Sequence, residues 1–298
     1  MLVADLLRDL YAPLRGVSDR TVALYDYTIR SWGQFLGRPP EICDFEELAV
    51  ARFLAHRLRE RSVATSAKDR SQIRALWEFA ARRGLVSVWP QIRPIRVPER
   101  IPVCWLTDEM TRLLEAARGR QGHIAGVPAS RFWVAALLTC YEVGERVGAL
   151  LALEWRDVSP AGVVFRAETR KGRRRDLYRQ ISEDCHAALE AIRMPRRLVF
   201  EWDRCPTNLY RHLGKICEAA GLPNDRSSKF HRIRKTTASY AAAAGLDAQR
   251  LLDHSSPVTT RAYIDPRVVQ TPSAPAVLPR ITPPRSEGAR THSSPSAS

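Results

Sequence analysis

Regularly spaced prolines divide this chain into two parts. Residues 89–103 read WPQIRPIRVPERIPV, with prolines at positions 90, 94, 98 and 102. A proline fixes φ and lacks the backbone N–H that a helix needs, so this segment cannot be helical and favours an extended chain. We therefore expect a linker over 89–105, between an N-terminal domain at 1–88 and a second domain at 106–265.

The first part has apolar residues at helical spacing. Between residues 18 and 37 they recur at steps of three and four and so share one helix face. They are Val22, Tyr25, Ile29, Trp32 and Leu36. Ser18 or Asp19 can cap this helix and Gly37 can end it. With two further helices expected at 46–60 and 65–83, residues 1–88 predict a small all-helical domain.

The second part mixes helical and strand patterns. Thr107 is the expected cap of its first helix, and the acidic residues that follow suit the positive end of the helix dipole. Residues 162–181 predict two strands around a basic turn at 170–173. Helices are expected at 131–141, 146–154, 183–193, 207–220, 231–244, 247–253 and 257–264. The predicted fold class is mainly α with a small β-sheet.

The last 33 residues have a different composition. Seven of the chain's 20 prolines fall in 266–298, among Ser, Thr and Ala. Such a segment cannot bury enough apolar surface to offset the entropy of ordering it. We expect a tail that is disordered or that docks only on a partner.

The charge balance indicates a polyanionic partner. Lys and Arg total 47 against 32 Asp and Glu, a net charge of +15, and nucleic acid is the usual partner of such a surface. No apolar run is long enough to span a bilayer and no secretory signal is visible, so we expect a cytoplasmic protein without membrane contact. The six cysteines lack zinc-site spacing, so reduced thiols and no metal are expected.

Arg146 is the first candidate for chemistry. It begins an apolar helix in GERVGALLALEWRDV (144–158). A guanidinium there is costly to bury unless it meets an anion, and its bidentate fork suits a phosphate. A salt bridge to Glu142, Glu145 or Asp157 is the alternative.

A basic turn supplies the second candidate. Lys171 would lie at the tip of the expected hairpin, where its ammonium could donate a proton to a leaving alkoxide. The alternative is a solvated turn that contacts phosphates non-specifically. The side chains expected to bind DNA are Arg170, Arg173, Arg174, Arg175 and Lys235.

Two later segments complete the set. In HRIRKTTAS, His231 and Arg234 are three residues apart and share a helix face, which places a base beside a fixed positive charge. In LLDHSSPVTTRAYIDP, His254 is followed nine residues later by Tyr263. A tyrosine hydroxyl becomes a nucleophile once a base and nearby cations favour the phenolate. The alternatives are a capped helix with solvated charges and a half-buried packing tyrosine.

The order of these groups resembles the tyrosine recombinase (phage integrase) family. The resemblance covers most of 106–265 and rests on R146 with LLALEWRDV behind it, K171, H231-R-I-R234 and L-D-H254-S-S-x-x-T-T-x-x-Y263. Residues 18–90 resemble the family's N-terminal helical core-binding (SAM-like) domain. The chain departs from the family pattern at Ala149, where an acidic residue is frequent, and at Asp253, where glycine is common.

The resemblance implies a site-specific DNA recombinase that acts without ATP, metal or other cofactor through a 3′-phosphotyrosyl intermediate. Tyr263 would be the nucleophile, and the catalytic residues would be Arg146, Lys171, His231, Arg234, His254 and Tyr263. The implied partners are double-stranded DNA with a specific site and, on two such sites, a homotetramer. Further arginines, Arg52, Arg57, Arg74, Arg82 and Arg93, could contact the DNA backbone. A type IB topoisomerase-like enzyme and a catalytically decayed DNA-binding relative are the alternatives.

Overall fold

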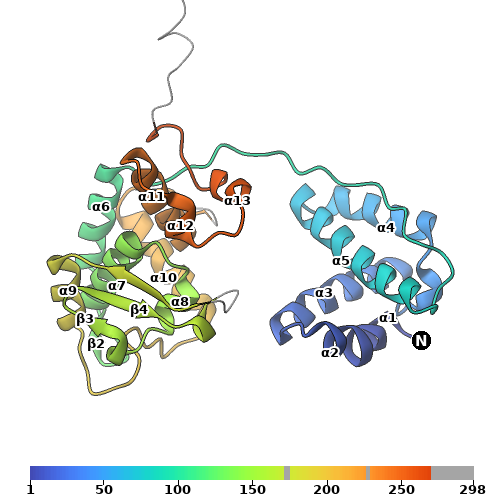
Figure 1. Ribbon diagram of the computed structural model, residues 1–298, viewed down its shortest axis with the longest axis horizontal. Helices are drawn as coiled ribbons and strands as arrows, with labels where there is room; N and C mark the ends of the chain where they lie inside the picture. The colour runs from blue at the N-terminus through green and yellow to red at the C-terminus, as the bar shows by residue number, and fades with distance from the viewer. Residues whose placement is uncertain (171–174, 226–228, 270–298) are drawn as a thin grey trace, which may run out of the picture. The chain divides into compact units, whose positions relative to one another are not determined.

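The computed structural model describes residues 1–170, 175–225 and 229–269 (Figure 1). The chain forms two compact units, Met1–Glu99 and Arg100–Ser298. Lys171, Arg173, Arg174 and most of the proline-rich tail lie outside the described residues.

The first unit is mainly helical up to Arg82, as expected. The helices α3 (Asp19–Leu36), α4 (Glu47–Glu60) and α5 (Val63–Arg82) confirm the three predicted ones, and α5 packs against both others. The Ser18 side chain caps α3 by accepting from the Thr21 N–H, and Gly37 ends it at a φ of 72°. The capping residue and the glycine C-cap were both readable from the sequence.

A further helical stretch at the N-terminus was not predicted. The helices α1 (Val3–Asp5) and α2 (Ala12–Arg15) are joined by a π-helical segment, Leu6–Tyr11. This stretch buries Val3, Leu6 and Leu7 completely against a core centred on aromatic side chains. The innermost of these are Trp32, Phe53 and Trp77.

The start of the proline-bearing segment is attached to this unit. Ile92 is buried in its core, and the Arg70 guanidinium donates to the carbonyl of Arg93 at 2.8 Å. The indole N–H of Trp77 donates to the carbonyl of Val88 at 2.7 Å. The extended chain therefore satisfies its carbonyls with side chains of α5, because proline-rich backbone has no ladder of its own.

The second unit is built around α7 (Ala129–Val143), which packs against α6 (Thr107–Arg118), α9 (Glu183–Glu190) and α11 (Phe230–Ala243). Phe132, Trp133 and Leu137 of α7 are buried at the centre of its core. The other helices are α8 (Val147–Leu151), α10 (Pro206–Ala219), α12 (Ala248–Leu252) and α13 (Pro257–Arg261). No helix within the described ranges is long and apolar enough to cross a bilayer.

A small antiparallel sheet has the strand order β3-β4-β5. Strand β4 (Gly162–Phe165) pairs with β5 (Leu177–Gln180), with Gly162 opposite Gln180 and Phe165 opposite Leu177. Both strands were predicted but are shorter than expected, because a 3-10 turn at Ala167–Thr169 leaves the ladder early. The short β3 (Val158–Ser159) and the separate pair β1 (His123–Ile124) and β2 (Val127–Pro128) were not predicted.

Several expected helix boundaries were wrong, among them the end of α9, which lies at Glu190 and not at 193. Leu106, not Thr107, is the N-cap of α6, because the Glu109 carboxylate takes the N–H of Leu106 while Thr107 faces Tyr240. The helix expected at 146–154 is reduced to α8, and the one expected at 257–264 ends at Arg261. With these changes the fold confirms the predicted class, mainly α with a small β-sheet.

Candidate active site

The second unit brings together five of the six residues that the sequence singled out. Arg146 is the N-cap of α8, while His231 and Arg234 lie on α11. His254 follows α12 and Tyr263 follows α13. The sixth, Lys171, lies outside the described residues. Segments more than 100 residues apart in sequence thus meet at one place, which spacing alone cannot establish.

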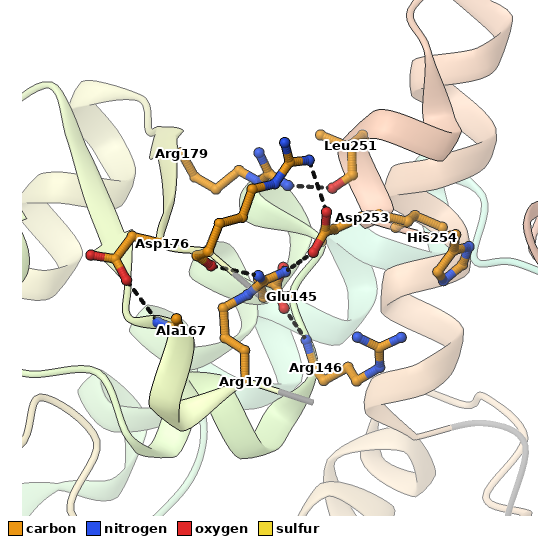
Figure 2. A network of polar contacts seen from close by, with 12 residues as sticks. Glu145, Arg146, Ala167, Arg170, Asp176, Arg179, Leu251, Asp253 and His254 are labelled. Carbon is orange, nitrogen blue, oxygen red and sulfur yellow. Dashed lines mark hydrogen bonds and ion pairs between the residues drawn. The ribbon is translucent and has the colours of Figure 1, made fainter. Parts of the chain in front are cut away.

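The guanidinium of Arg146 is not engaged by the carboxylates expected as alternatives. Glu142 instead accepts two hydrogen bonds from Ser182, and both Glu145 and Asp157 pair with other arginines. In Figure 2 only the backbone N–H of Arg146 joins the neighbouring ionic network, through a 3.2 Å bond to Glu145. Among the described residues, Arg146 has no ion-pair partner, so its half-buried charge is available to an external anion.

The guanidinium of Arg234 has more hydrogen-bond partners than that of Arg146. The Arg234 side chain is 1% exposed and donates to the carbonyls of Gly144 and, at 2.6 Å, Leu252. Its Nη1 lies 3.8 Å from Glu145, and its Nη2 lies 3.4 Å from the His254 ring. Burial lowers the pKa of Arg234 to about 10, against the pull of Glu145, so the guanidinium stays charged at neutral pH. Its orientation is fixed before any ligand arrives.

Both histidines are neutral at pH 7. Although His231 is exposed, desolvation by the atoms around its ring, followed by the cations Lys235, Arg234 and Arg146, lowers the pKa of His231 to about 4. Burial, followed by Arg234 and Arg146, lowers the pKa of His254 to about 4 as well. Desolvation and like charge act in the same direction here, which marks an electropositive site.

The ring of His254 is oriented by two partners. Its Nδ1 lies 3.1 Å from the Thr260 hydroxyl, and its Nε2 lies 3.4 Å from Nη2 of Arg234. A guanidinium can only donate, so Nε2 accepts and the single proton of the neutral ring is assigned to Nδ1, which donates to Thr260. If an anion accepts the Arg234 hydrogen bond instead, Nε2 of His254 is no longer needed as an acceptor and can become a donor.

Tyr263 lies between the two histidines. Its ring centroid is 4.8 Å from that of His231, at an interplanar angle of 63°, and 4.8 Å from that of His254, at 57°. The Arg234 guanidinium carbon lies 5.8 Å from the centroid of the same ring. The side chain is 8% exposed, so it both packs and faces a base and a cation. A neighbouring base can take the proton of an attacking phenol.

The segment that carries Tyr263 is anchored to other segments of the second unit. The Ser239 hydroxyl donates to the carbonyl of Tyr263 at 3.1 Å and accepts from the N–H of Asp265 at 2.9 Å. The Asp265 carboxylate accepts from the N–H of Cys104 at 2.8 Å and pairs with Arg267 at 2.7 Å. Burial opposes the ionisation of Asp265, but these donors outweigh it and hold the pKa of Asp265 well below its usual range. This aspartate was not predicted from the sequence, because no spacing rule singles it out.

The residues expected at DNA lie in different surroundings. The side chain of Arg170 is 2% exposed and pairs with Glu145 and Asp253, so it offers no free charge to a backbone (Figure 2). Arg175 is exposed but pairs with Asp253 at 2.9 Å. Lys235 is half-buried, and burial followed by the charge of Arg232 lowers its pKa. Arg173 and Arg174 lie outside the described residues.

The arginines named in the first unit also differ. Arg57 is 5% exposed and pairs with the buried Asp69, which argues against the expected DNA contact. Arg74 is half-buried beside Glu78. The exposed ones are Arg52, Arg82 and Arg93.

No set of three His, Cys, Asp or Glu side chains within the described ranges is placed to hold a metal ion. The site instead gathers guanidiniums, imidazoles and a phenol. This donor set suits an oxyanion and a proton transfer.

Comparison with known proteins agrees with this architecture. Residues 7–84 match the family described as "Phage integrase, N-terminal SAM-like domain". No curated protein sequence matches the chain significantly.

Solved structures of low identity share the fold over most of the chain. A lambda integrase dimer bound to a COC′ core site is 18% identical, covers 90% of this chain and 96% of its own, and has a TM-score of 0.69. The Tn1549 transposon integrase in complex with transposon right end DNA is 12% identical, with coverages of 89% and 95% and a TM-score of 0.68. The XerH recombinase bound to a palindromic difH substrate is 16% identical, with coverages of 86% and 78% and a TM-score of 0.64.

These likenesses define a two-unit protein of the integrase fold. The N-terminal unit matches the phage integrase SAM-like domain over residues 7–84, and the chain shares the fold of these solved integrases and recombinases. This confirms the resemblance on which the sequence analysis relied.

Proposed function

We propose that this protein is a site-specific DNA recombinase that cuts and rejoins DNA through a covalent 3′-phosphotyrosyl intermediate. The observation that carries the proposal is the position of Tyr263. Its ring touches the two imidazoles, and the Arg234 guanidinium lies over it, while Arg146 is close to the same histidines and has no ion-pair partner in the part of the chain that the structure describes.

The two arginines would stabilise the transition state. As the phenol oxygen attacks phosphorus, negative charge gathers on the non-bridging oxygens, and fixed donors in a dry site stabilise that charge most. Arg234 is already oriented by two backbone carbonyls, and Arg146 is free to pair. In the free site, Nε2 of His254 accepts from Arg234. Once an oxygen of the phosphate accepts from Arg234 in its place, His254 would add a hydrogen bond to the phosphate.

The protons balance without a cofactor. The bond between Tyr263 Oη and phosphorus forms as the bond from phosphorus to the 5′-oxygen breaks. His231 would take the phenol proton, and Lys171 would supply one to the departing 5′-oxygen. The phosphotyrosyl bond conserves the energy of the phosphodiester, so the reverse reaction with another 5′-hydroxyl reseals the strand without ATP.

The substrate would be double-stranded DNA with a specific site. Among the similar structures, a lambda integrase dimer is described as bound to a COC′ core site, the Tn1549 integrase as bound to transposon right end DNA, and a lambda integrase tetramer as bound to a Holliday junction. We extend this to a homotetramer on two DNA sites, acting in the cytoplasm. The net charge of +15 supports a polyanionic partner.

A covalent trap tests the proposal without knowledge of the target. Nicked duplexes with a randomised core are incubated with the full chain, and DNA that stays attached in detergent is recovered and sequenced. We expect one recovered motif and its loss in Tyr263→Phe, with cleavage unchanged by a metal chelator. Tyr210→Phe is the matched control, because that exposed tyrosine lies on α10.

The alternatives predict different outcomes. A topoisomerase-like enzyme would relax supercoiled plasmid without joining two copies of the recovered site. A decayed DNA-binding relative would bind the motif but form no covalent species. Equal trapping by wild type and Tyr263→Phe would overturn the assignment of the nucleophile.

A further inference from the structure

One buried guanidinium connects two loops of the site. Arg170 follows the 3-10 turn after β4, and its Nη2 lies 3.0 Å from Glu145 Oε1 and 3.1 Å from Asp253 Oδ2. Its Nη1 also donates to the carbonyl of Arg175 at 3.2 Å. Figure 2 shows Arg170 between the two carboxylates, which come from different parts of the chain.

Each of these acids directly precedes an active-site residue. Glu145 lies in the junction between α7 and α8, immediately before Arg146. Asp253 is the C-cap of α12, immediately before His254. The contacts of Arg170 therefore fix the distance between the loop that presents Arg146 and the loop that presents His254.

The charges in this cluster pair with one another, and Arg146 is left without an ion-pair partner among residues 1–170, 175–225 and 229–269. Glu145 is 1% exposed and faces both Arg170 and Arg234, while Asp253 faces Arg170 and Arg175. Buried carboxylates are stable only when they are paired, so the acids are satisfied by arginines other than Arg146. Without Arg170, Glu145 would lose its closest cation and could turn toward Arg146.

The backbone of Asp253 supports the same conclusion independently. Its φ is 51°, in the left-handed region that glycine adopts at low cost and other residues adopt at some cost. A non-glycine residue stays in that backbone conformation when the contacts of its side chain offset the strain. Asp253 makes two ion pairs. The same loop is also held by Arg179, which donates a hydrogen bond to the carbonyl of Leu251 at 2.5 Å.

We propose that Arg170 is a positioning residue, which bridges Glu145 and Asp253 and thereby sets the spacing of Arg146 and His254 around the scissile phosphate. This rests on the proposed function for the identity of the anion. It assigns Arg170 to the inside of the site and not to the DNA backbone.

Binding of inorganic phosphate tests the bridge without any DNA. The imidazole nitrogens of His254, followed by NMR in the full chain, report the dissociation constant. We expect Arg170→Gln and Asp253→Gly each to weaken phosphate binding about tenfold, because the two loops separate. The double variant should bind phosphate no more weakly than the weaker-binding of the two single variants, since both changes break the same bridge. Asp253→Gly relaxes the left-handed backbone, which offsets part of the cost of removing one carboxylate partner of Arg170.

Arg166→Gln is the matched control. Arg166 lies beside β4 and also pairs with two acids, Asp157 and Asp176, neither of which adjoins an active-site residue. We expect its phosphate affinity to stay within about twofold of wild type. Wild-type affinity in Arg170→Gln, or an equal loss in Arg166→Gln, would overturn the proposal.

The covalent trap on the recovered motif gives a second readout. We expect Arg170→Gln to slow covalent attachment about 100-fold at saturating DNA, with unchanged DNA affinity and salt dependence, and Arg170→Lys to recover part of the rate. A DNA contact at Arg170 would instead weaken binding and reduce the salt slope. If wild type forms no covalent species while phosphate binding still depends on Arg170, the recombinase proposal fails and the bridge stands.

Discussion

The imidazole of His231 meets the phenol ring of Tyr263 edge to face, with ring centroids 4.8 Å apart. The first residue comes from α11 and the second from the segment after α13. The pKa of His231, lowered to about 4, leaves the imidazole neutral and able to accept a proton over the whole physiological range. A base is therefore held beside the proposed nucleophile before DNA binds.

Replacing this base should slow cleavage selectively. We expect His231→Gln to reduce the rate of covalent attachment by about 100-fold or more, because a positioned base contributes that much to proton transfer. The wild-type rate should be flat between about pH 5.5 and 8 and fall as His231 protonates toward its pKa of about 4. His186→Gln, on α9, is the control. Attachment as fast in His231→Gln as in wild type would exclude this role.

The depressed histidine pKa values also predict a pH-dependent stability. Unfolded histidine has a pKa near 6.5, whereas folded His254 has one of about 4. Between these values the unfolded chain binds a proton that the folded chain does not, so the free energy of unfolding falls as pH is lowered from about 6.5 to 4. His254→Gln should flatten this dependence relative to wild type. Melting curves at pH 7 and pH 5 measure it, and parallel slopes in the two proteins would contradict the assignment.

Elements with a strong local signal were predictable from the sequence. Helix α3 has a capping serine, a regular apolar face and a terminal glycine, and its bounds were close to those expected. The stretch Val3–Arg15 and the strand β3 lack such signals, because long-range packing and pairing, not local propensity, fix them.

The candidate site was predictable as a set of residue types but not as a network. The order of Arg146, His231, Arg234, His254 and Tyr263 follows motifs that a single sequence can display. The partners that hold them, Glu145, Asp253 and Asp265, depend on contacts between distant segments. A basic residue in a turn, such as Arg170, has the same local sequence whether it is buried or exposed, so its burial could not be inferred.

The anchor of the tyrosine segment leads to another prediction. Asp265→Asn removes the charge that pairs with Arg267 but keeps the shape of the side chain. We expect a loss of about 1–3 kcal/mol in stability, since a buried partner of a charged group is left unsatisfied. Covalent attachment should slow while DNA affinity is retained, because only the Tyr263 segment loosens. Glu168→Gln, in the turn after β4, is the control, and unchanged attachment by Asp265→Asn would show that the anchor does not place the nucleophile.

The first unit contains a buried ion pair whose loss should be costly. Asp69 is fully buried, accepts from the Thr28 hydroxyl at 2.7 Å and pairs with Nε of Arg57 at 2.8 Å. Asp69→Asn leaves the Arg57 guanidinium buried without its charge partner, so we expect a loss of about 3–5 kcal/mol in the stability of this unit. Hydrogen exchange of α5 amides in the full chain measures that loss. Glu78→Gln breaks a more exposed pair with Arg74 on the same helix and should cost under about 1 kcal/mol. Similar exchange rates in the two variants would contradict a structural role for Arg57 and would return it to the set of candidate DNA contacts.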